Sequence, residues 1–444
     1  MDRAEARMVE QVINRELAER FPDGAALRAE VLLHDDDPAV EPDELTVRVL
    51  LPAPGERAEY QAALTAWADA HREQVEAVRR ELWLRLPEAT MVEFTVDDPD
   101  PGTPKIGLPV DLGPQSNHEI VSSALALVRA NYVFPEVADR AATAVEARLA
   151  AGEYDDLDLE ALAGRLTSDL NQICDDKHLR LQAEGPRPGR SGGAGPRPRR
   201  EEPDDYEARM LGLRRSGRLD NFGIHRVERL EGNVGYLDLR RVPVPAVAGP
   251  AIAAAMELVA GTYALLIDLR RNRGGAPDGV VLWCSYLFGD EPTHLNDIFR
   301  ADTGETRQFW ALPYVPGPRY LERPVWVLTS EWTFSGGEDF AYTLQALGRA
   351  EVIGETTGGG AHPTRGFPIT RELHIGVPFA RSVNPVTGTN WQGTGVVPDV
   401  PVRADDARDV AYARALRHVL GLDEVPPPIA DEAREALDRL PPGP

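Results

Sequence analysis

The sequence predicts an α/β protein: a large core of strands and helices, a helical unit before it, and a small N-terminal α/β module. The first observation is a set of short, apolar, β-branched runs whose later members are separated by helical stretches, the pattern of strands feeding helices. These runs lie at 234–240, 264–270, 325–330 and 351–355. The second observation is that residues 118–174 contain three stretches with the length and apolar spacing of helices.

Composition and patterning divide the 444 residues into five segments. Residues 184–220 are rich in Pro, Gly and Arg and cannot bury enough apolar surface to order themselves, so we expect a flexible loop there. The tail is acidic and proline-rich with one short helical stretch, and we expect it to be peripheral. The segments are the N-terminal module at 1–105, the helical unit at 106–183, the loop at 184–220, the core at 221–421 and the tail at 422–444.

The N-terminal module is expected to hold a helix, strands at 26–33 and 44–51, a long helix and a strand at 90–96. One face of the long helix should cover the module's own sheet, with a dimer seam as the alternative. That face carries Leu64, Trp67, His71, Val75, Val78 and Leu82. We expect its histidine to be a packed side chain rather than a ligand. Residues 97–109, rich in Pro and Asp, are expected to form a linker.

Two local patterns indicate further elements, one at the end of the helical unit and one within the core. The helical unit ends in DDKHLRLQ at 175–182, where helical spacing gives way to a short alternating run. RELHIGVPFARS at 371–382 predicts a hairpin.

Net charge and cysteine content limit the kinds of partner and bound group that we expect for this protein. A formal charge of -24 argues against nucleic acid or an anionic membrane as the main partner, since both require a basic face. The first residues have no apolar run of the secretion type, and no stretch approaches the roughly 18 apolar residues of a membrane helix. We therefore expect a cytoplasmic protein. Cys174 and Cys284 lie in different segments without partners at metal-ligand spacing, so we expect no disulfide framework and no metal site. We also expect no cofactor.

The stretch TFSGGEDF raises the question of what Ser335 does. Its spacing from Glu338 is that of a helix capping box. A cap alone does not explain Gly336 and Gly337, because glycine costs about 1 kcal/mol relative to alanine inside a helix. A strand, a sharp turn, a serine and a helix also form the geometry of an exposed nucleophile. Glycines behind it let a substrate carbonyl approach the backbone.

A second glycine pair is a candidate for the other half of such a site. RRNRGG at 270–275 follows an expected strand directly. Gly274 and Gly275 would present backbone N–H groups at the end of that strand, where an acyl-transfer site needs a second oxyanion donor. An ordinary glycine-rich turn is the alternative for this fragment alone.

Residues 327–363 closely resemble the core of the S41 serine peptidases, in the branch related to interphotoreceptor retinoid-binding protein (IRBP). The resemblance extends over about 110–405 and includes GNVGYLDLR, LLIDLRRNRGG and NPVTGTNWQGTGVVPDV. It implies a crotonase-like α/β core behind a helical unit, and cleavage of peptides through a serine acyl-enzyme. It also implies that Ser335 is the nucleophile and that the amides of Gly275 and Gly336 form the oxyanion hole, with Gly274 as a secondary candidate.

The base is not the one used by every S41 branch. Tail-specific members use a lysine where this chain has Gly360, and their PDZ domain is missing here. The other branch resembles the tricorn protease core, in which a histidine at the end of the helical unit is the base. His178 fits that position, and we favour it over His362, which is the rival candidate.

Two positions depart from the tricorn-like pattern. Lys177 stands where a serine precedes the base, and Gln392 stands where a glutamate is expected to orient it. A glutamine can orient a ring through its amide oxygen but cannot offset the charge of an imidazolium. The analogous Asp-to-Asn change in a serine-protease triad costs about 10⁴ in rate. Other carboxylates that are near in sequence are Glu338, Asp339 and Glu355.

The expected function is therefore a peptidase acting on short peptides. The alternative is a catalytically weak or inactive S41-like protein that binds peptides or apolar ligands. In that case an apolar cleft beside the RRNRGG turn would be lined by Trp283, Tyr286 and Phe288, although core packing is their commoner role. A third hypothesis is that residues 1–105 dock the chain into an assembly, which includes self-association as a homo-oligomer.

Overall fold

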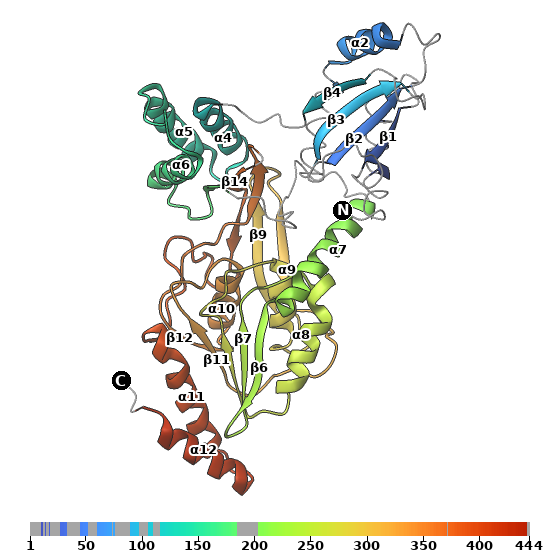
Figure 1. Cartoon of the computed structure of the whole chain (residues 1–444). Coiled ribbons are helices and arrows are strands. Elements are labelled where there is room, and N and C mark those ends of the chain that lie inside the picture. Colours follow the sequence, from blue (N-terminus) through green and yellow to red (C-terminus); the bar gives the residue numbers. More distant parts are fainter. Residues whose placement is uncertain are drawn as a thin grey trace.

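The computed structural model describes residues 10–11, 14, 17, 27–32, 45–51, 60–72, 74–75, 89–96, 105–109, 116–183, 203–370 and 372–441. Within these residues the chain forms a small N-terminal sheet, a helical unit and a larger α/β core (Figure 1). The predicted fold class is thereby confirmed. Among the described residues, no helix combines the length and the apolar character needed to cross a membrane.

The N-terminal sheet has the strand order β1-β2-β3-β4. Its elements are β1 (Arg28–Leu32), β2 (Leu45–Leu51), α2 (Tyr60–Ala70), β3 (Ala89–Val96) and β4 (Lys105–Pro109). The strands β2 and β3 are parallel with α2 between them in sequence, and both edge strands are antiparallel to their neighbours. The predicted strands and long helix are confirmed. The predicted linker is wrong in its last part, because pairing with β3 makes 105–109 an edge strand.

The long helix covers its own sheet, as predicted, because α2 packs on β3 and β4. Leu64 and Val75 are buried, and the Trp67 ring lies 5.7 Å from the ring of Phe94. His71 stacks on the same tryptophan at 4.8 Å, which confirms that it is a packed side chain. The remaining two residues of the predicted face, at 78 and 82, lie outside the described residues.

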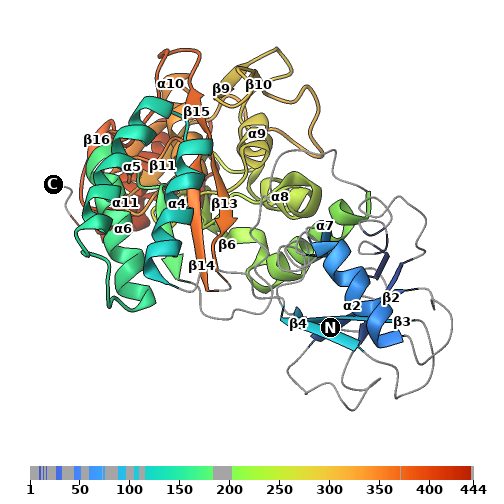
Figure 2. The same ribbon diagram turned by 90° about the horizontal axis from the view of Figure 1, so that it is seen from above.

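Three helices form the unit before the core, as predicted: α4 (Asn117–Asn131), α5 (Pro135–Ala150) and α6 (Leu159–Cys174). Side-chain caps begin two of them: Ser116 and Glu119 make a capping box at α4, and the Asp158 side chain accepts from the Ala161 amide at α6. The helices share a buried cluster with an antiparallel sheet of order β13-β14-β5, and Figure 2 shows them grouped beside β14. Its strands are β5 (Arg180–Ala183), β13 (Thr364–Pro368) and β14 (Leu373–Pro378).

The core sheet has the order β16-β12-β11-β8-β7-β6, and only the β6–β7 pair is antiparallel. All four predicted core strands are present. The strands are β6 (Ile224–Leu230), β7 (Val234–Leu239), β8 (Ala264–Asp268), β11 (Val325–Thr329), β12 (Glu351–Gly354) and β16 (Val400–Pro401). The helices are α7 (Pro203–Leu219), α8 (Pro245–Val259), α9 (Pro277–Ser285), α10 (Gly336–Ala346), α11 (Ala404–Leu420) and α12 (Pro427–Arg439). A third sheet, β10-β9-β15, is built from β9 (His294–Arg300), β10 (Thr306–Trp310) and β15 (Ala380–Val383).

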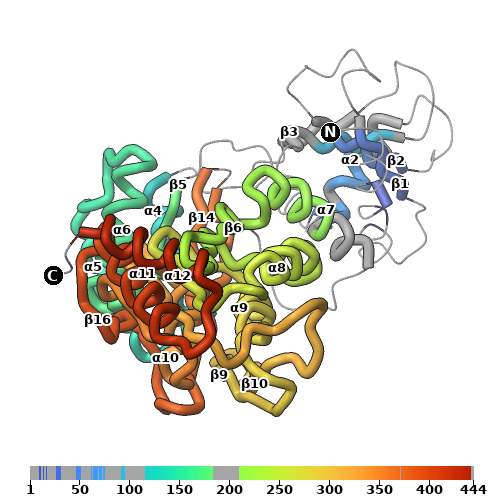
Figure 3. The backbone as a smooth tube through the Cα atoms, turned by 90° about the horizontal axis from the view of Figure 1, so that it is seen from below, coloured from blue at the N-terminus to red at the C-terminus, as the bar shows by residue number. Residues whose placement is uncertain are grey.

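Both faces of the core sheet are buried, which explains its near-continuous apolar strands. Leu265 and Ile267 point into a cluster with α8, α9 and α10, whereas Leu266 packs with α11 and α12 on the other face. Figure 3 shows α11 and α12 side by side. Because the β8 and β11 strands are parallel neighbours, the turns that follow them meet at one edge of the sheet.

Two predictions at the segment boundaries are wrong. The flexible loop predicted at 184–220 contains the helix α7, because Met210 is buried and Leu213 packs against the core cluster. The rest of that loop, 184–202, lies outside the described residues. The tail forms the predicted helix, α12, but it is not peripheral, since Ala433 and Ala436 are buried against the core.

The hairpin predicted at 371–382 is also wrong. The strands β14 and β15 do not pair with each other: β14 pairs with β13 and β5, and β15 pairs with β9. Pro378 ends β14, and the chain passes through Phe379 into a different sheet. Proline cannot donate to a ladder, so a continued hairpin would lose a backbone hydrogen bond at that position. This switch between sheets forms one wall of the site described next.

Candidate active site

Ser335 stands between β11 and α10 in a strained conformation. Its backbone has φ 53° and ψ −122°, and it occupies the N-cap position of α10. Only a few per cent of non-glycine residues adopt a positive φ, and such outliers gather at functional sites. A strained serine on a strand-to-helix turn exposes its hydroxyl at the edge of the sheet.

The turn after β8 packs directly against this serine. The Asn272 side chain accepts from the Gly274 amide at 2.8 Å, and its backbone oxygen accepts from the Phe334 amide at 3.0 Å. A Cβ on Gly274 would come within 2.7 Å of Ser335 Cβ. A Cβ on Gly275, whose φ is 149°, would lie 1.9 Å from a backbone oxygen. Glycine is therefore required at 274 for the two turns to meet, and at 275 for the turn to pack against the backbone of Val242.

Two backbone amides are available beside Ser335. The Gly275 nitrogen lies 3.0 Å from the position that a Cβ on Gly336 would occupy. Gly336 is the first residue of α10, so its N–H has no partner within the helix. In the described part of the chain neither amide donates a hydrogen bond to another residue. These two donors and the positive end of the helix dipole suit a developing oxyanion.

Glu338 holds the start of α10 against a neighbouring loop. Its buried carboxylate accepts from the amides of Ser335 at 2.7 Å, Gly359 at 2.6 Å and Gly360 at 2.9 Å. Burial raises the pKa of Glu338, and its hydrogen bonds, first that from Thr357, act in the opposite direction. The predicted cap is thus present, and the same residue anchors the loop that leads to His362.

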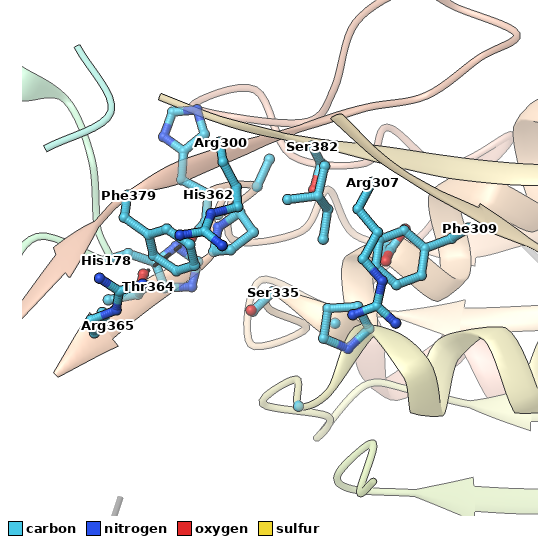
Figure 4. Close-up of a pocket in the computed structure, with 18 of the residues that line it drawn as sticks. His178, Arg300, Arg307, Phe309, Ser335, His362, Thr364, Arg365, Phe379 and Ser382 are labelled. Carbon is cyan, nitrogen blue, oxygen red and sulfur yellow. Dashed lines mark hydrogen bonds between the residues drawn. The ribbon is translucent and has the colours of Figure 1, made fainter. Parts of the chain in front are cut away.

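A cavity of about 630 Å³ opens at this edge of the core sheet and collects most of the predicted site residues. Ser335, Gly275, Gly336, His178 and His362 all line it. In Figure 4 both histidines lie on one side of the serine. Its walls come from the turns after β8 and β11, from the first residues of α9 and α10, and from the sheets β13-β14-β5 and β10-β9-β15.

His178 lies in a turn two residues before β5 rather than on the strand itself. Its ring centroid is 4.6 Å from that of Phe334, the residue before Ser335. Burial lowers the pKa of His178 to about 4. Its Nδ1 is buried and has no hydrogen-bond partner among the described residues.

Gly360 stands where the resemblance to tail-specific S41 peptidases would place a lysine, and it leaves room for the His178 ring. A Cβ on Gly360 would lie 2.4 Å from the Phe334 ring and 2.7 Å from the Cε1 atom of His178. Any side chain at 360 would therefore displace both rings. The His178 ring can occupy its observed position only when residue 360 is glycine.

His362 is paired with a carboxylate that the sequence analysis missed. Its Nδ1 lies 2.6 Å from Oδ2 of Asp176, and both side chains are buried. Asp176 also accepts from the His178 amide at 3.1 Å and from the Tyr132 hydroxyl at 3.3 Å. The signal for it was the pair of aspartates immediately before Lys177 and His178.

Lys177 and Gln392, the two residues that depart from the tricorn-like pattern, both form hydrogen bonds to backbone groups. The Gln392 amide oxygen accepts from the Ala361 amide at 2.8 Å, and its NH₂ group donates to the Asp175 carbonyl at 3.1 Å. Lys177 donates to the Gly358 carbonyl at 2.6 Å. Neither hydrogen bond of Gln392 goes to a histidine ring. Instead, these side chains join the segment of His178 to the loop of His362.

The other carboxylates considered from sequence have structural partners. Asp339 accepts from Asn296 at 3.1 Å and from Thr343 at 3.2 Å, and it lines the cavity. Burial raises the pKa of Asp339 to about 7. Glu355 accepts from the Ala404 amide at 3.0 Å.

The three aromatic residues that were expected to line an apolar cleft in the alternative do not line the cavity beside Ser335. Trp283 and Tyr286 are buried in the core cluster, and Phe288 packs against that cluster. None of the three lines the cavity beside Ser335. Core packing is therefore their role in the described structure.

Two family models match the chain. Residues 233–402 match peptidase family S41, and residues 115–209 match the N-terminal domain of peptidase S41 in eukaryotic IRBP. Among solved structures, a lipoprotein from Streptococcus agalactiae is similar with 12% identity and a TM-score of 0.44, over 69% of this chain and 99% of that one. A photosystem II D1 C-terminal processing protease has 16% identity and a TM-score of 0.41, over 66% and 94%. The tricorn protease has 13% identity and a TM-score of 0.42, over 75% and 38%.

Proposed function

Because the chain belongs to peptidase family S41, we propose that it is a serine peptidase that hydrolyses peptide bonds through an acyl-enzyme on Ser335. The observation that carries this proposal is the setting of that serine. It is a strained N-cap residue packed against the Gly274 turn, and it lines one cavity with Gly275, Gly336 and two histidines. A buried structural cap would need neither the strain nor the open amides.

The proposed acylation begins when Ser335 Oγ attacks the carbonyl carbon of the substrate and a histidine takes the hydroxyl proton. The carbonyl oxygen becomes an oxyanion, to which the Gly275 and Gly336 amides donate. The C–N bond then breaks, and the amine leaves with the proton that the histidine returns. Water, deprotonated by the same histidine, hydrolyses the ester and restores the serine.

We propose His178 as that base. Its ring packs on Phe334, next to the nucleophile, and its low pKa keeps it neutral at physiological pH. Neutral imidazole is the form that accepts a proton. His362 is the rival candidate, because its pairing with Asp176 is the arrangement of histidine and aspartate in a serine-protease triad.

A second function is favoured by one specific observation. The buried Nδ1 of His178 lacks a partner among the described residues, and Gln392 stands where a glutamate was expected. An imidazolium at His178 would therefore have no hydrogen-bonded carboxylate. This supports a catalytically weak or inactive member that binds peptides or apolar ligands. A cytoplasmic location, a peptide partner and assembly through residues 1–105 stay predictions.

Reaction with a fluorophosphonate probe tests the proposed function. The wild type should be labelled, with one probe adduct on the peptide that contains Ser335 by mass spectrometry. Ser335→Ala should not be labelled. Ser216→Ala is a matched control, since Ser216 lies on α7 away from the cavity, and its labelling should equal that of the wild type. A wild type that stays unlabelled and hydrolyses no peptide would favour the ligand-binding alternative.

A further inference from the structure

The cavity beside Ser335 is rich in arginine. Arg300 on β9, Arg307 on β10 and Arg365 on β13 line it, together with the carboxylates of Asp278 and Asp339. The whole chain has a formal charge of -24, so a basic wall at this one place is unexpected from composition. In Figure 4 Arg365 and Arg300 lie on the side of Ser335 that also holds the two histidines.

Two of these arginines are neutralised by partners. Arg307 pairs with Asp278 at 2.5 Å, and both members of this pair are well exposed. Arg300 pairs with Asp302, donating at 3.1 Å and 2.7 Å to its two oxygens. The hydrogen bond to Asp302, and after it the negative charges of Asp302 and Glu305, raise the pKa of Arg300.

Arg365 has no such partner. In the described part of the chain it makes no ion pair or hydrogen bond, and its guanidinium lies 4.5 Å from the ring centroid of Phe379. Arg300 also lies over that ring, at 5.7 Å. Burial, and then the positive charge of Arg300, lower the pKa of Arg365, while only Asp302 opposes them. The hydrogen bonds of Asp302 go to Arg300, so Arg365 is left without a hydrogen-bonded carboxylate among the described residues.

A half-buried cation beside a second cation is an unfavourable arrangement unless an anion joins it. The guanidinium is planar, with donors in a fork that matches both oxygens of a carboxylate. Phe379 holds the Arg365 guanidinium from one face, so its edge remains for a ligand. The ligand would lie in the same cavity as the nucleophile.

We propose that Arg365, supported by Arg300 and Phe379, binds a carboxylate carried by the peptide substrate. The carboxylate belongs either to the C-terminus of the peptide or to an acidic side chain near the scissile bond. This inference rests on the proposed peptidase function, since it assigns the substrate class of that same cavity. The preferred ligand would then be a negatively charged peptide, although the protein itself has a negative net charge.

Binding and turnover of matched peptides test this inference. Three peptides of one sequence are needed: one with a free C-terminus, one with a C-terminal amide, and one amide in which a Gln near the scissile bond becomes Glu. Binding to Ser335→Ala is measured by fluorescence anisotropy, and kcat/KM is measured with the wild type. Because the first readout needs no catalysis, failure of hydrolysis and failure of the carboxylate site are distinguishable.

We expect at least one carboxylate-bearing peptide to bind about tenfold or more tightly than the neutral amide, as for a charge-assisted hydrogen bond. A gain for the free C-terminus alone identifies terminal recognition, and a gain for the Glu peptide alone identifies side-chain recognition. Arg365→Met should remove the preference, and Arg365→Lys should restore part of it.

The matched control is Arg381→Met. Arg381 also stacks on an aromatic ring, Phe299, at 5.1 Å, but it does not line the cavity. This variant loses the same charge and should keep the preference. Equal binding of all three peptides to Ser335→Ala, or a preference that survives Arg365→Met, would overturn the proposal.

Discussion

Oδ2 of Asp176 lies 2.6 Å from Nδ1 of His362, and the other oxygen of the same carboxylate accepts from the His178 amide at 3.1 Å. One buried carboxylate therefore holds both candidate bases, the ring of one and the backbone of the other. The two histidines stand in a fixed relation to each other, and a change at Asp176 would affect both. Their separate roles must be tested on the rings themselves.

Replacing each histidine by glutamine separates their roles, because glutamine is polar but cannot take up a proton. We expect His178→Gln to slow the fluorophosphonate reaction about 100-fold or more, since a general base typically contributes 10²–10⁴. His362→Gln should keep most of the rate. It should lower the free energy of unfolding by about 1–3 kcal/mol, because the Asp176 carboxylate loses a buried partner. Labelling kinetics and urea unfolding provide the two measurements.

The reverse result would assign the base to His362. In that case His362→Gln would remove the reaction, His178→Gln would not, and Asp176 would become the orienting carboxylate of a triad. Near-ultraviolet circular dichroism of both variants controls for loss of the native packing around Phe334.

The pH dependence of labelling gives an independent test of the base. Burial lowers the pKa of His178 to about 4, and the neutral ring is the active form. Protonation removes the base only below that pKa. We therefore expect the second-order rate constant to be flat from neutral pH down to about 5 and to fall by half near 4. An acid limb near the ordinary histidine value of about 6.5 would contradict His178 as the base in this conformation.

The setting of Ser335, the proposed nucleophile, was predictable from sequence because its signals are local. Ser335, Gly336 and Gly337 follow a buried-type strand and begin an apolar-faced helix, so strand period, turn chemistry and helix cap all lie within one short stretch. The glycine pair at 274–275 was recognisable for the same reason. Both turns end neighbouring parallel strands, and their contact follows from the sheet order.

The residues around the two candidate bases were harder to predict because their contacts are long-range. Asp176 and His362 are separated by 186 positions and meet only because β5 and β13 flank β14 in one sheet. That sheet in turn depends on β14 and β15 separating at Phe379, where the sequence favours a hairpin. Gln392 was expected at a histidine ring through family resemblance, and its side chain instead binds the backbone of two loops.

Filling the proposed oxyanion hole should suppress catalysis while leaving the fold. A Cβ on Gly336 would lie 3.0 Å from both the nitrogen and the oxygen of Gly275, within the space where the oxyanion would bind. We expect Gly336→Ala to lower kcat about 10²–10³-fold, the usual cost of losing an oxyanion donor. The control is Gly249→Ala on α8, where an added Cβ meets nothing within 4 Å, and its kcat should equal that of the wild type. Equal kcat values for both variants would move the oxyanion site elsewhere.

Placing the glutamate of the tricorn-like pattern at position 392 should not raise peptide hydrolysis. Gln392→Glu keeps the acceptor for the Ala361 amide, but it replaces the donor to the Asp175 carbonyl by an oxygen that repels it. We expect kcat/KM for peptide hydrolysis to stay the same or fall, and the free energy of unfolding to fall by about 1 kcal/mol or more. A gain of tenfold or more in kcat/KM would mean that the new carboxylate turns toward a histidine and that the natural chain is a weakened enzyme.

Asp339 should make stability depend on pH. Burial raises its folded-state pKa to about 7, above the ordinary value of about 3.8, so between these values the native state binds more protons than the unfolded state. The free energy of unfolding should therefore fall as pH rises from about 4 to 7 and lose nothing further from this group above 7. Asp339→Asn keeps an oxygen acceptor for Asn296 and Thr343 but carries no charge. We expect this variant to exceed the wild type in stability at pH 8 and to lose that advantage at pH 5. Urea unfolding of both proteins at these two pH values measures the difference, and an advantage that is equal at both would show that Asp339 is not the titrating group.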